Sequence, residues 1–414
     1  MTFFQKNADK LAPLTLSGKA KYRDCQVGAA WATLAHFTAS SEPALISMPT
    51  GSGKTNVMIM LSFLLKADRV IIVTPSVTLR GQIAKKFSSM EDMRSISAYP
   101  DSAPRPNVKD HKGKLDSDDA WKEFLNYDVV VVTPHTTSSG YDSISPPPKD
   151  LFSTRTLLFI DEAHHSRART WNDLIASFAD LHVILLTATP FRNDNRRLLA
   201  KLIYHYPMRK AMETGIYSTI KYHAVEPTDP KNKDKELCDK ALQIFNSQKK
   251  KYPMARLLIR AEGVQGSKNI LELYRKAGLV VEEVNYQRNI EDNEDAIEKV
   301  RLGQIDGIVC VNQVGEGIDI PNLKVAVLHK PRQSFPATVQ FVGRISREPT
   351  IPVGEPHLIA CPDDVQGQLR KLYTQDNAWR ELVPDLVEKI VGKVTKRTSF
   401  HKVVDVETEI DVDV

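Results

Sequence analysis

The chain has 414 residues, 42% hydrophobic and 26% charged, and its formal net charge of +5 permits a polyanionic partner without requiring one. This length exceeds what one hydrophobic core usually serves and predicts two domains, while the composition excludes a low-complexity protein. No apolar run is long enough to cross a bilayer and MTFFQKNADK (1–10) lacks the apolar core of a secretory signal, so we expect a cytoplasmic protein with no membrane partner and four reduced cysteines.

Short apolar runs alternate with helical patterns in the first half of the chain. The runs are ALISM (44–48), RVIIV (69–73), DVVVV (128–132), LLFI (157–160) and HVILL (182–186). They are bounded at both ends and lack period-two alternation, which is typical of strands buried on both faces of a parallel sheet. Helical patterns lie between them, as at 54–66 and 78–89. This rhythm predicts a doubly wound α/β domain.

The rhythm breaks near 205–235, where the chain is polar and rich in Pro and Lys, and then resumes. The later runs are RLLIR (256–260), LVVEEV (279–284), GIVCV (307–311) and VAVLH (325–329). We therefore predict two tandem α/β domains, at residues 1–215 and 216–362, each with a doubly wound parallel sheet and joined by a connector near 206–220.

Two further segments stand outside this pattern. Residues 97–119 are polar and rich in Pro and Asp, and we predict a surface insertion with little intrinsic order. Residues 363–414 are predicted to form a C-terminal helix and strand extension, because VVDVETEIDVDV (403–414) alternates apolar and acidic residues. Such a strand would pair within this protein, continue into a longer parent chain, or contact a protein partner.

The segment MPTGSGKTN (48–56) follows the first apolar run and precedes a helical pattern. Gly51 and Gly53 allow backbone N–H groups to wrap a phosphate, Lys54 neutralises the phosphate, and Thr55 offers a hydroxyl to Mg²⁺. The positive end of the following helix adds to this attraction. Met48 replaces the first glycine of the full phosphate-loop pattern, but the inner residues are intact. A nucleotide site is therefore predicted, formed by Thr50, Gly51, Ser52, Gly53, Lys54 and Thr55.

A second polar cluster, DEAHH (161–165), follows the buried run LLFI. Asp161 at the end of a strand would supply an oxygen ligand to Mg²⁺ held by nucleotide phosphates. Glu162 would polarise the water that attacks the γ-phosphate. His164 and His165 are adjacent and diverge, and no H-E-x-x-H pattern is present, so these residues favour ATP and Mg²⁺ over a transition-metal hydrolase.

With GSGKT and DEAH in this order, the chain resembles a superfamily 2 helicase or translocase over about residues 20–350. The further motifs are YRDCQ (22–26), VTPSVTLRGQ (73–82), VTPH (132–135), TATP (187–190), VNQVGEGIDIP (311–321) and QFVGRISR (340–347). The wording of GEGIDIP, DEAHH and TATPFR is closest to the restriction-type and XPB-like DNA translocases. The resemblance implies two RecA-like domains with ATP between them.

The same resemblance implies roles for individual residues. Arg344 and Arg347 are three apart on a predicted helix, and both would reach the γ-phosphate from the second domain, so that ATP would close the cleft between domains. Arg23 and Gln26 would contact adenine, and Gly317 and Asp319 would line the nucleotide site. The residues implied to contact nucleic acid or to couple it to ATP are Arg80, Thr133, His135, His164, Thr187, Thr189 and Gln340.

These observations together predict an ATP-dependent nucleic-acid translocase or helicase that uses Mg²⁺ and acts on DNA in preference to RNA. Two alternatives remain open: an ATP-driven clamp or switch subunit of a defence or restriction assembly, and an RNA helicase. Comparing ATP hydrolysis across nucleic acids would separate the RNA alternative, and strand displacement would separate the clamp.

Overall fold

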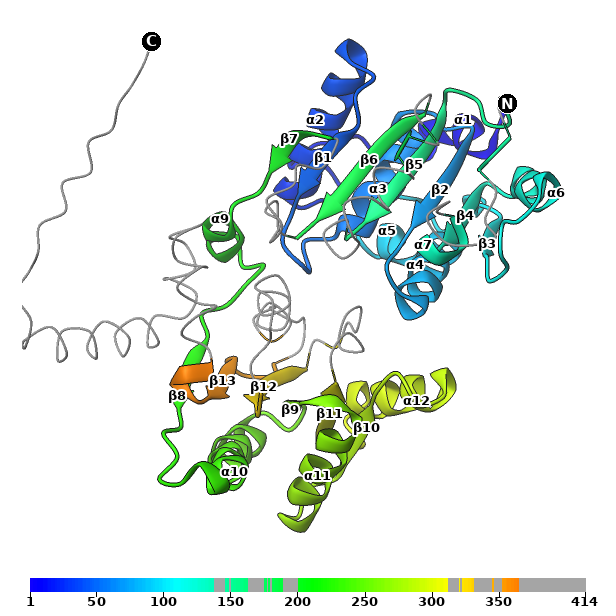
Figure 1. The fold of residues 1–414 in the computed structure, drawn as a ribbon. Helices are drawn as coiled ribbons and strands as arrows, with labels where there is room; N and C mark the ends of the chain where they lie inside the picture. The colour runs from blue at the N-terminus through cyan, green and yellow to red at the C-terminus, as the bar shows by residue number, and fades with distance from the viewer. Residues whose placement is uncertain are drawn as a thin grey trace, which may run out of the picture.

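The computed structural model of the chain describes residues 1–137, 146–148, 150–162, 175–176, 178, 181–188, 200–311, 320, 322–330, 345 and 352–364. Its strands form two sheets, one of seven strands within residues 44–205 and one of six strands within residues 221–360 (Figure 1). All pairings in both sheets are parallel. The prediction of two tandem parallel-sheet α/β units is confirmed.

The first sheet has the strand order β3-β4-β2-β5-β6-β1-β7. Its strands are β1 (Ala44–Ser47), β2 (Arg69–Val73), β3 (Val108–Asp110), β4 (Val129–Val132), β5 (Thr156–Asp161), β6 (His182–Thr187) and β7 (Lys201–His205). Alternate residues of β2 enter different apolar layers, with Val70 and Ile72 on one face and Ile71 and Val73 on the other. Burial on both faces is why this strand reads as an uninterrupted apolar run.

Helices cover both faces of this sheet (Figure 1). They are α1 (Phe3–Lys6), η1 (Ala8–Lys10), α2 (Asp24–Ala39), α3 (Lys54–Leu64), α4 (Val77–Ser89), α5 (Glu91–Ser95), α6 (Asp118–Lys122), η2 (Glu123–Asn126) and α7 (Pro134–Thr137). Helix α4 begins after Ser76, whose hydroxyl accepts a 3.3 Å hydrogen bond from the N–H of Leu79. This cap satisfies one of the amides that a helix start leaves unpaired.

The expectation that residues 97–119 have little intrinsic order is wrong. The segment contributes β3, which pairs with β4 at the edge of the first sheet. It also buries Tyr99 and Leu115 in the apolar layers, and the Tyr99 hydroxyl donates a 2.9 Å hydrogen bond to the carbonyl of Pro104. A few apolar anchors suffice to order a polar segment when a strand edge is available to pair with it.

Residues 206–220, called the connector below, join the two sheets. The first sheet ends with β7 at His205, the connector contains α9 (Met208–Glu213), and β8 (Lys221–Ala224) begins the second sheet (Figure 1). Among its described side chains, the connector buries those of Tyr206, Ala211, Ile216, Tyr217 and Ile220. The domain boundary at residue 215 falls inside the connector, and we retain it as a proposal.

The second sheet has the order β10-β11-β9-β12-β13-β8. Its remaining strands are β9 (Arg256–Ala261), β10 (Val281–Val284), β11 (Gly307–Val311), β12 (Leu323–Leu328) and β13 (His357–Ala360), and its helices are η3 (Pro230–Asn232), α10 (Lys233–Lys251), α11 (Gly263–Lys276) and α12 (Ile290–Arg301). Helix α10 buries Leu237, Ala241, Ile244 and Phe245 along one face, as its amphipathic spacing requires.

Residues 365–414, most of the predicted extension, lie outside the described residues. No helix in the described part of the chain is both long and apolar enough to span a membrane.

Candidate functional site

The candidate site lies at the carboxyl ends of three adjacent strands of the first sheet. In the strand registers, Ser47 of β1 is opposite Thr187 of β6, and Leu186 is opposite Asp161 of β5. The segment 48–53 leaves β1 at this edge and leads directly into α3, which begins at Lys54. Ligands of open parallel α/β sheets bind at this edge, so the fold brings both predicted motifs together where a nucleotide is expected.

Two glycines give the segment 48–53 its tight path. Gly51 has φ of 81° and Gly53 has φ of 90°, both in the left-handed region, which side chains disfavour. A Cβ on Gly53 would lie 2.1 Å from Nε2 of Gln26. Gly53 is therefore required both for its backbone conformation and for the close approach of α2.

Three consecutive carbonyl groups of this loop are held by side chains from elsewhere in the chain. The Tyr217 hydroxyl donates to the Thr50 carbonyl at 2.7 Å, an Arg23 guanidinium N–H donates to the Gly51 carbonyl, and Gln26 Nε2 donates to the Ser52 carbonyl at 3.1 Å. In a planar trans peptide the next N–H points away from the carbonyl. Turning the carbonyls toward the protein therefore turns the N–H groups toward the open side.

The loop amides are consequently arranged to receive an anion. Within the described part of the chain, the N–H groups of Gly51 and Gly53 have no backbone acceptor, whereas the N–H of Ser52 bonds to the Pro49 carbonyl at 3.3 Å. The first amides of α3 add the positive end of the helix. This arrangement fits a phosphate group and agrees with the predicted roles of Thr50 to Thr55.

Lys54 and Glu162 form an ion pair at the centre of the site. Lys54 Nζ lies 2.7 Å from Glu162 Oε1, and each side chain is only 10% exposed. The other carboxylate oxygen of Glu162 accepts a 3.4 Å hydrogen bond from the N–H of Ala188, just after β6. Glu162 has φ of 51°, a strained conformation for a residue other than glycine and one that is frequent at functional sites.

Asp161 is the last residue of β5 and is buried beside this pair. Its Oδ1 has no hydrogen-bond partner within the described residues. Burial, with a smaller contribution from the charge of Glu162, raises the pKa of Asp161 to about 7, while Lys54 opposes that rise. A buried carboxylate oxygen without a described partner fits a hard cation such as Mg²⁺. Thr55, the second residue of α3, stays a predicted ligand.

The described residues contain no group of three or more His, Cys, Asp or Glu side chains that could hold a metal ion by themselves. His164 and His165, the basis of the transition-metal alternative, lie outside these residues. The predicted site residues Arg344, Arg347, Gly317, Asp319, His164, Thr189 and Gln340 also lie outside them.

Gln26 supports the phosphate loop. Its side chain is 3% exposed, its Oε1 accepts from the N–H of Arg23 at 3.1 Å, and its Nε2 donates to the Ser52 carbonyl. The amide thus caps the start of α2 and holds the loop. These bonds use one of the two Nε2 hydrogens and one of the two Oε1 lone pairs, and the adenine contact of Gln26 stays a prediction.

The predicted nucleic-acid contacts are mostly buried. Arg80 is 5% exposed and forms an ion pair with Asp110 of β3, and Thr133, which directly precedes α7, is 5% exposed and accepts a hydrogen bond at its carbonyl from the Thr136 hydroxyl. Thr187 is 1% exposed, and its carbonyl accepts from the N–H of Met48 at 2.9 Å. Of the described residues in this group, His135 is exposed on α7. Contact of Arg80 with a phosphate backbone would require its ion pair to open.

Sequence reasoning missed the residues of the connector that contact this site. Tyr217 bonds to Thr50, and Tyr206 donates to the carboxylate of Asp24, the first residue of α2. The available signal was the presence of two tyrosines among the apolar residues of the connector. Spacing alone did not indicate that Tyr217 would reach the phosphate loop or that Tyr206 would reach α2.

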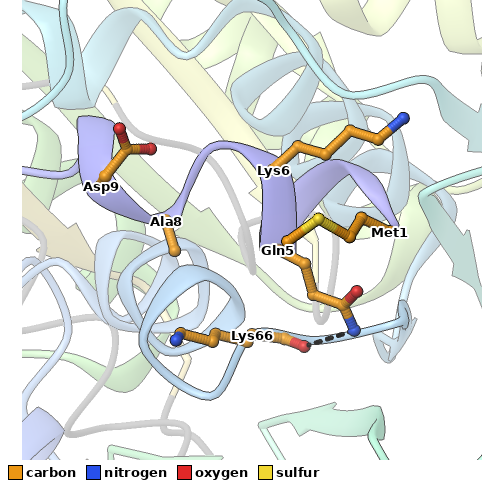
Figure 2. Close-up of a pocket in the computed structure, with 6 residues that line it drawn as sticks. All are labelled: Met1, Gln5, Lys6, Ala8, Asp9 and Lys66. Atoms are coloured by element: carbon orange, nitrogen blue, oxygen red, sulfur yellow. Dashed lines mark hydrogen bonds between the residues drawn. The ribbon is translucent and has the colours of Figure 1, made fainter.

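A surface pocket elsewhere on the first unit does not belong to this site. Figure 2 shows that Met1, Gln5, Lys6, Ala8, Asp9 and Lys66 line it. Lys66 follows the last turn of α3, whereas the phosphate loop precedes the first turn. The helix has 11 residues, and at a rise of 1.5 Å per residue the two ends are about 16 Å apart.

Comparison with known proteins supports a helicase assignment for both units. The profile of the family described as type III restriction enzyme, res subunit, matches residues 19–192, and that of the helicase conserved C-terminal domain matches residues 234–348. The DNA 3'-5' translocase XPB2 of Sulfurisphaera tokodaii is 24% identical over 398 residues, which cover 82% of each chain. A protein named as a helicase from the Sulfolobus islandicus filamentous virus is 23% identical over 73% of this chain, and the chain spans 57% of that protein.

Solved structures with both DNA and RNA share the fold. The type ISP restriction-modification enzyme LlaBIII bound to DNA has a TM-score of 0.60 at 19% identity, over 88% of this chain and 30% of that one. Dbp5 of Saccharomyces cerevisiae bound to RNA and ADP BeF3 has a TM-score of 0.58 at 14% identity, over 92% and 100%. The two matched profiles, the ordered motifs and the tandem parallel sheets show that the chain belongs to the superfamily 2 helicases and translocases, with a restriction-type first domain followed by a helicase C-terminal domain.

Proposed function

We propose that the protein is an ATP-dependent translocase or helicase that hydrolyses ATP with Mg²⁺ and acts on DNA. The observation that carries this proposal is the phosphate loop, whose carbonyls are held by side chains and whose Gly51 and Gly53 amides have no backbone acceptor among the described residues, beside the Lys54–Glu162 ion pair and the Asp161 Oδ1, which has no described partner. DNA is favoured because XPB2, which is similar over 82% of each chain, is named a DNA translocase. LlaBIII, which was solved bound to DNA, and Dbp5, which was solved bound to RNA, share the fold alone.

The ion pair suggests how substrate binding prepares the site. Glu162 Oε1 is occupied by Lys54 at 2.7 Å. A γ-phosphate offers Lys54 a stronger, multiply charged partner, so ATP binding would release Glu162 to orient and deprotonate the attacking water. Thr55 and Asp161 would hold Mg²⁺, which neutralises phosphate charge when bound. Arg344 and Arg347 are proposed to complete the charge stabilisation from the second domain.

The test compares Glu162→Gln with the wild type and with Glu272→Gln, a control whose side chain is 71% exposed on α11. ATP hydrolysis is measured with double-stranded DNA, single-stranded DNA and RNA at one fixed salt concentration, because affinity for phosphate backbones depends steeply on salt. We expect DNA to stimulate the wild type and the control equally. Glu162→Gln should lose about 100-fold or more in turnover and should still bind ATP.

Other outcomes discriminate among the alternatives. Wild-type turnover by Glu162→Gln would contradict the catalytic assignment. Stimulation by RNA alone would favour an RNA helicase. DNA-stimulated hydrolysis that displaces neither a DNA strand nor a triplex-forming oligonucleotide would favour the clamp or switch subunit, and in that case a protein partner in a defence or restriction assembly is the function to pursue.

A further inference from the structure

The connector contacts the phosphate loop through a pair of hydrogen bonds between Tyr217 and Thr50. The Tyr217 hydroxyl donates to the Thr50 carbonyl at 2.7 Å and lies 2.7 Å from the Thr50 hydroxyl. Because a phenol has one hydrogen to donate, the Thr50 hydroxyl is the donor in the second bond. Tyr217 is 2% exposed and its ring belongs to the apolar core, so its position is set by packing and by the loop together.

The bond from Tyr217 determines the direction of one phosphate-facing amide. The Thr50 carbonyl and the Gly51 N–H belong to the same peptide plane and point in opposite directions. Holding the carbonyl in place therefore orients the Gly51 N–H toward the open side of the loop. A phosphate that pulls on this N–H would act on the same plane, and hence on the hydroxyl of Tyr217.

A second contact ties the connector to the other side of the loop. The Tyr206 hydroxyl donates to the carboxylate of Asp24, with oxygen distances of 2.9 and 3.0 Å, and Lys210 Nζ lies 3.4 Å from the same carboxylate. Asp24 begins α2, the helix whose first turn provides Gln26 to the Ser52 carbonyl. The connector thus reaches two of the three held carbonyls, one directly and one through α2.

The connector is anchored to the second sheet just as closely. Three residues separate Tyr217 from Lys221, where β8 begins. The N–H of Lys221 bonds to the Pro356 carbonyl at 2.9 Å, and the Tyr222 hydroxyl donates to the Ala360 carbonyl at 3.1 Å on β13. Four residue steps span at most about 14 Å when fully extended, so little slack separates the phosphate loop from the first strand of the second sheet.

We propose that Tyr217 is a positioning residue that couples nucleotide occupancy of the phosphate loop to the connector, and through it to the second sheet. This inference rests on the proposed function, because it requires nucleotide to bind at the loop. A bound phosphate reorients the Thr50–Gly51 peptide, and the hydroxyl of Tyr217 transmits that change to β8. Arginines from the second domain are not needed for this route.

The experiment compares Tyr217→Phe with Tyr99→Phe. Both changes delete one buried hydroxyl and keep a ring in the same apolar core, but the Tyr99 hydroxyl donates to the Pro104 carbonyl, which belongs neither to the loop nor to the connector. Hydrogen exchange of residues 206–220 is measured by mass spectrometry with and without ADP and Mg²⁺, beside the Kd for ADP and the kcat and KM for ATP. One hydrogen bond of ordinary strength corresponds to about a fivefold effect.

We expect nucleotide to change exchange in the connector of the wild type and of Tyr99→Phe by about fivefold. Tyr217→Phe should lose this response and about fivefold of the nucleic-acid-stimulated kcat, while its KM for ATP stays within about twofold. If Tyr217→Phe does not fold, Thr50→Val removes one of the two bonds from the other side, and Thr50→Ser retains the hydroxyl.

An unchanged exchange response in Tyr217→Phe would overturn the proposal, as would a connector in the wild type that does not respond to bound nucleotide. The failure of the proposed function looks different, because the wild type would then neither bind ADP nor hydrolyse ATP. Equal effects of Tyr217→Phe and Tyr99→Phe would indicate a loss of packing without coupling, and would also refute the role assigned to Tyr217.

Discussion

Replacement of Lys54 by Met tests the charge arrangement of the site through stability alone. The methionine keeps the length and most of the apolar stem of lysine but removes its charge. It leaves Glu162, 10% exposed, without its partner at 2.7 Å, and leaves Asp161 beside it with no cation to lower its pKa. Two neighbouring buried carboxyl groups then lose the positive charge of Lys54.

The expected cost follows from burial. Breaking a buried ion pair by removing one partner costs about 3–5 kcal/mol. Here Glu162 keeps its bond from the N–H of Ala188, which places Lys54→Met near the lower limit, about 3 kcal/mol. Adding Glu162→Gln removes the stranded charge, so the double variant should recover about 2 kcal/mol. A domain stability of about 5–15 kcal/mol leaves Lys54→Met folded.

The assay is urea unfolding at pH 8 without nucleotide, followed by tryptophan fluorescence, since Trp121 is fully buried in the first unit. Lys122→Met serves as the control, because Lys122 pairs with Asp119 on the surface with side chains 57% and 90% exposed, and it should leave the transition unchanged. Additive effects of Lys54→Met and Glu162→Gln, within about 0.5 kcal/mol, would refute the reasoning.

Three further predictions concern other residues of the site. Burial raises the pKa of Asp161 in the folded protein from 3.8 to about 7, so this carboxyl group does not destabilise the folded protein below pH 4 but does so increasingly as the pH rises to 7. Asp161→Asn should therefore raise the melting temperature of the nucleotide-free protein by about 2–4 °C at pH 8 and leave it unchanged at pH 4. An equal gain at both pH values would contradict this prediction. Gly53→Ala places a Cβ 2.1 Å from Gln26 Nε2 at a residue whose φ is 90°. Because both the contact and the conformation disfavour a side chain, calorimetry should show that the affinity for ADP is weakened about tenfold or more. An affinity equal to that of the wild type would show that the loop tolerates a side chain. Arg80→Ala breaks the ion pair with Asp110 and should cost about 2 kcal/mol in urea unfolding while leaving the salt dependence of DNA binding unchanged; a shallower salt slope would instead make Arg80 a phosphate contact.

The helices and strands that could be predicted from the sequence are those specified by residues that are close together in the chain. RVIIV (69–73) is buried on both faces of the sheet and reads as an uninterrupted apolar run, and the helical pattern at 78–89 corresponds to α4. The segment GSGKT needs only its own glycines and the following helix, so its path was predictable from contiguous residues. Short edge strands were harder: β3, with three residues, is ordered by pairing with β4 instead of by its own apolar content.

By itself, the sequence determined the tandem α/β pattern and the two motifs, because periodicity and contiguous motifs are properties of neighbouring residues. Only the tertiary structure decided how those motifs are held. Lys54 meets Glu162 across 108 positions, Gln26 meets Ser52 across 26, and Tyr217 meets Thr50 across 167. Such contacts depend on which strands lie side by side and on which end of each helix faces the sheet edge. The order of residues along the chain does not show which strands are neighbours or how the helices are oriented.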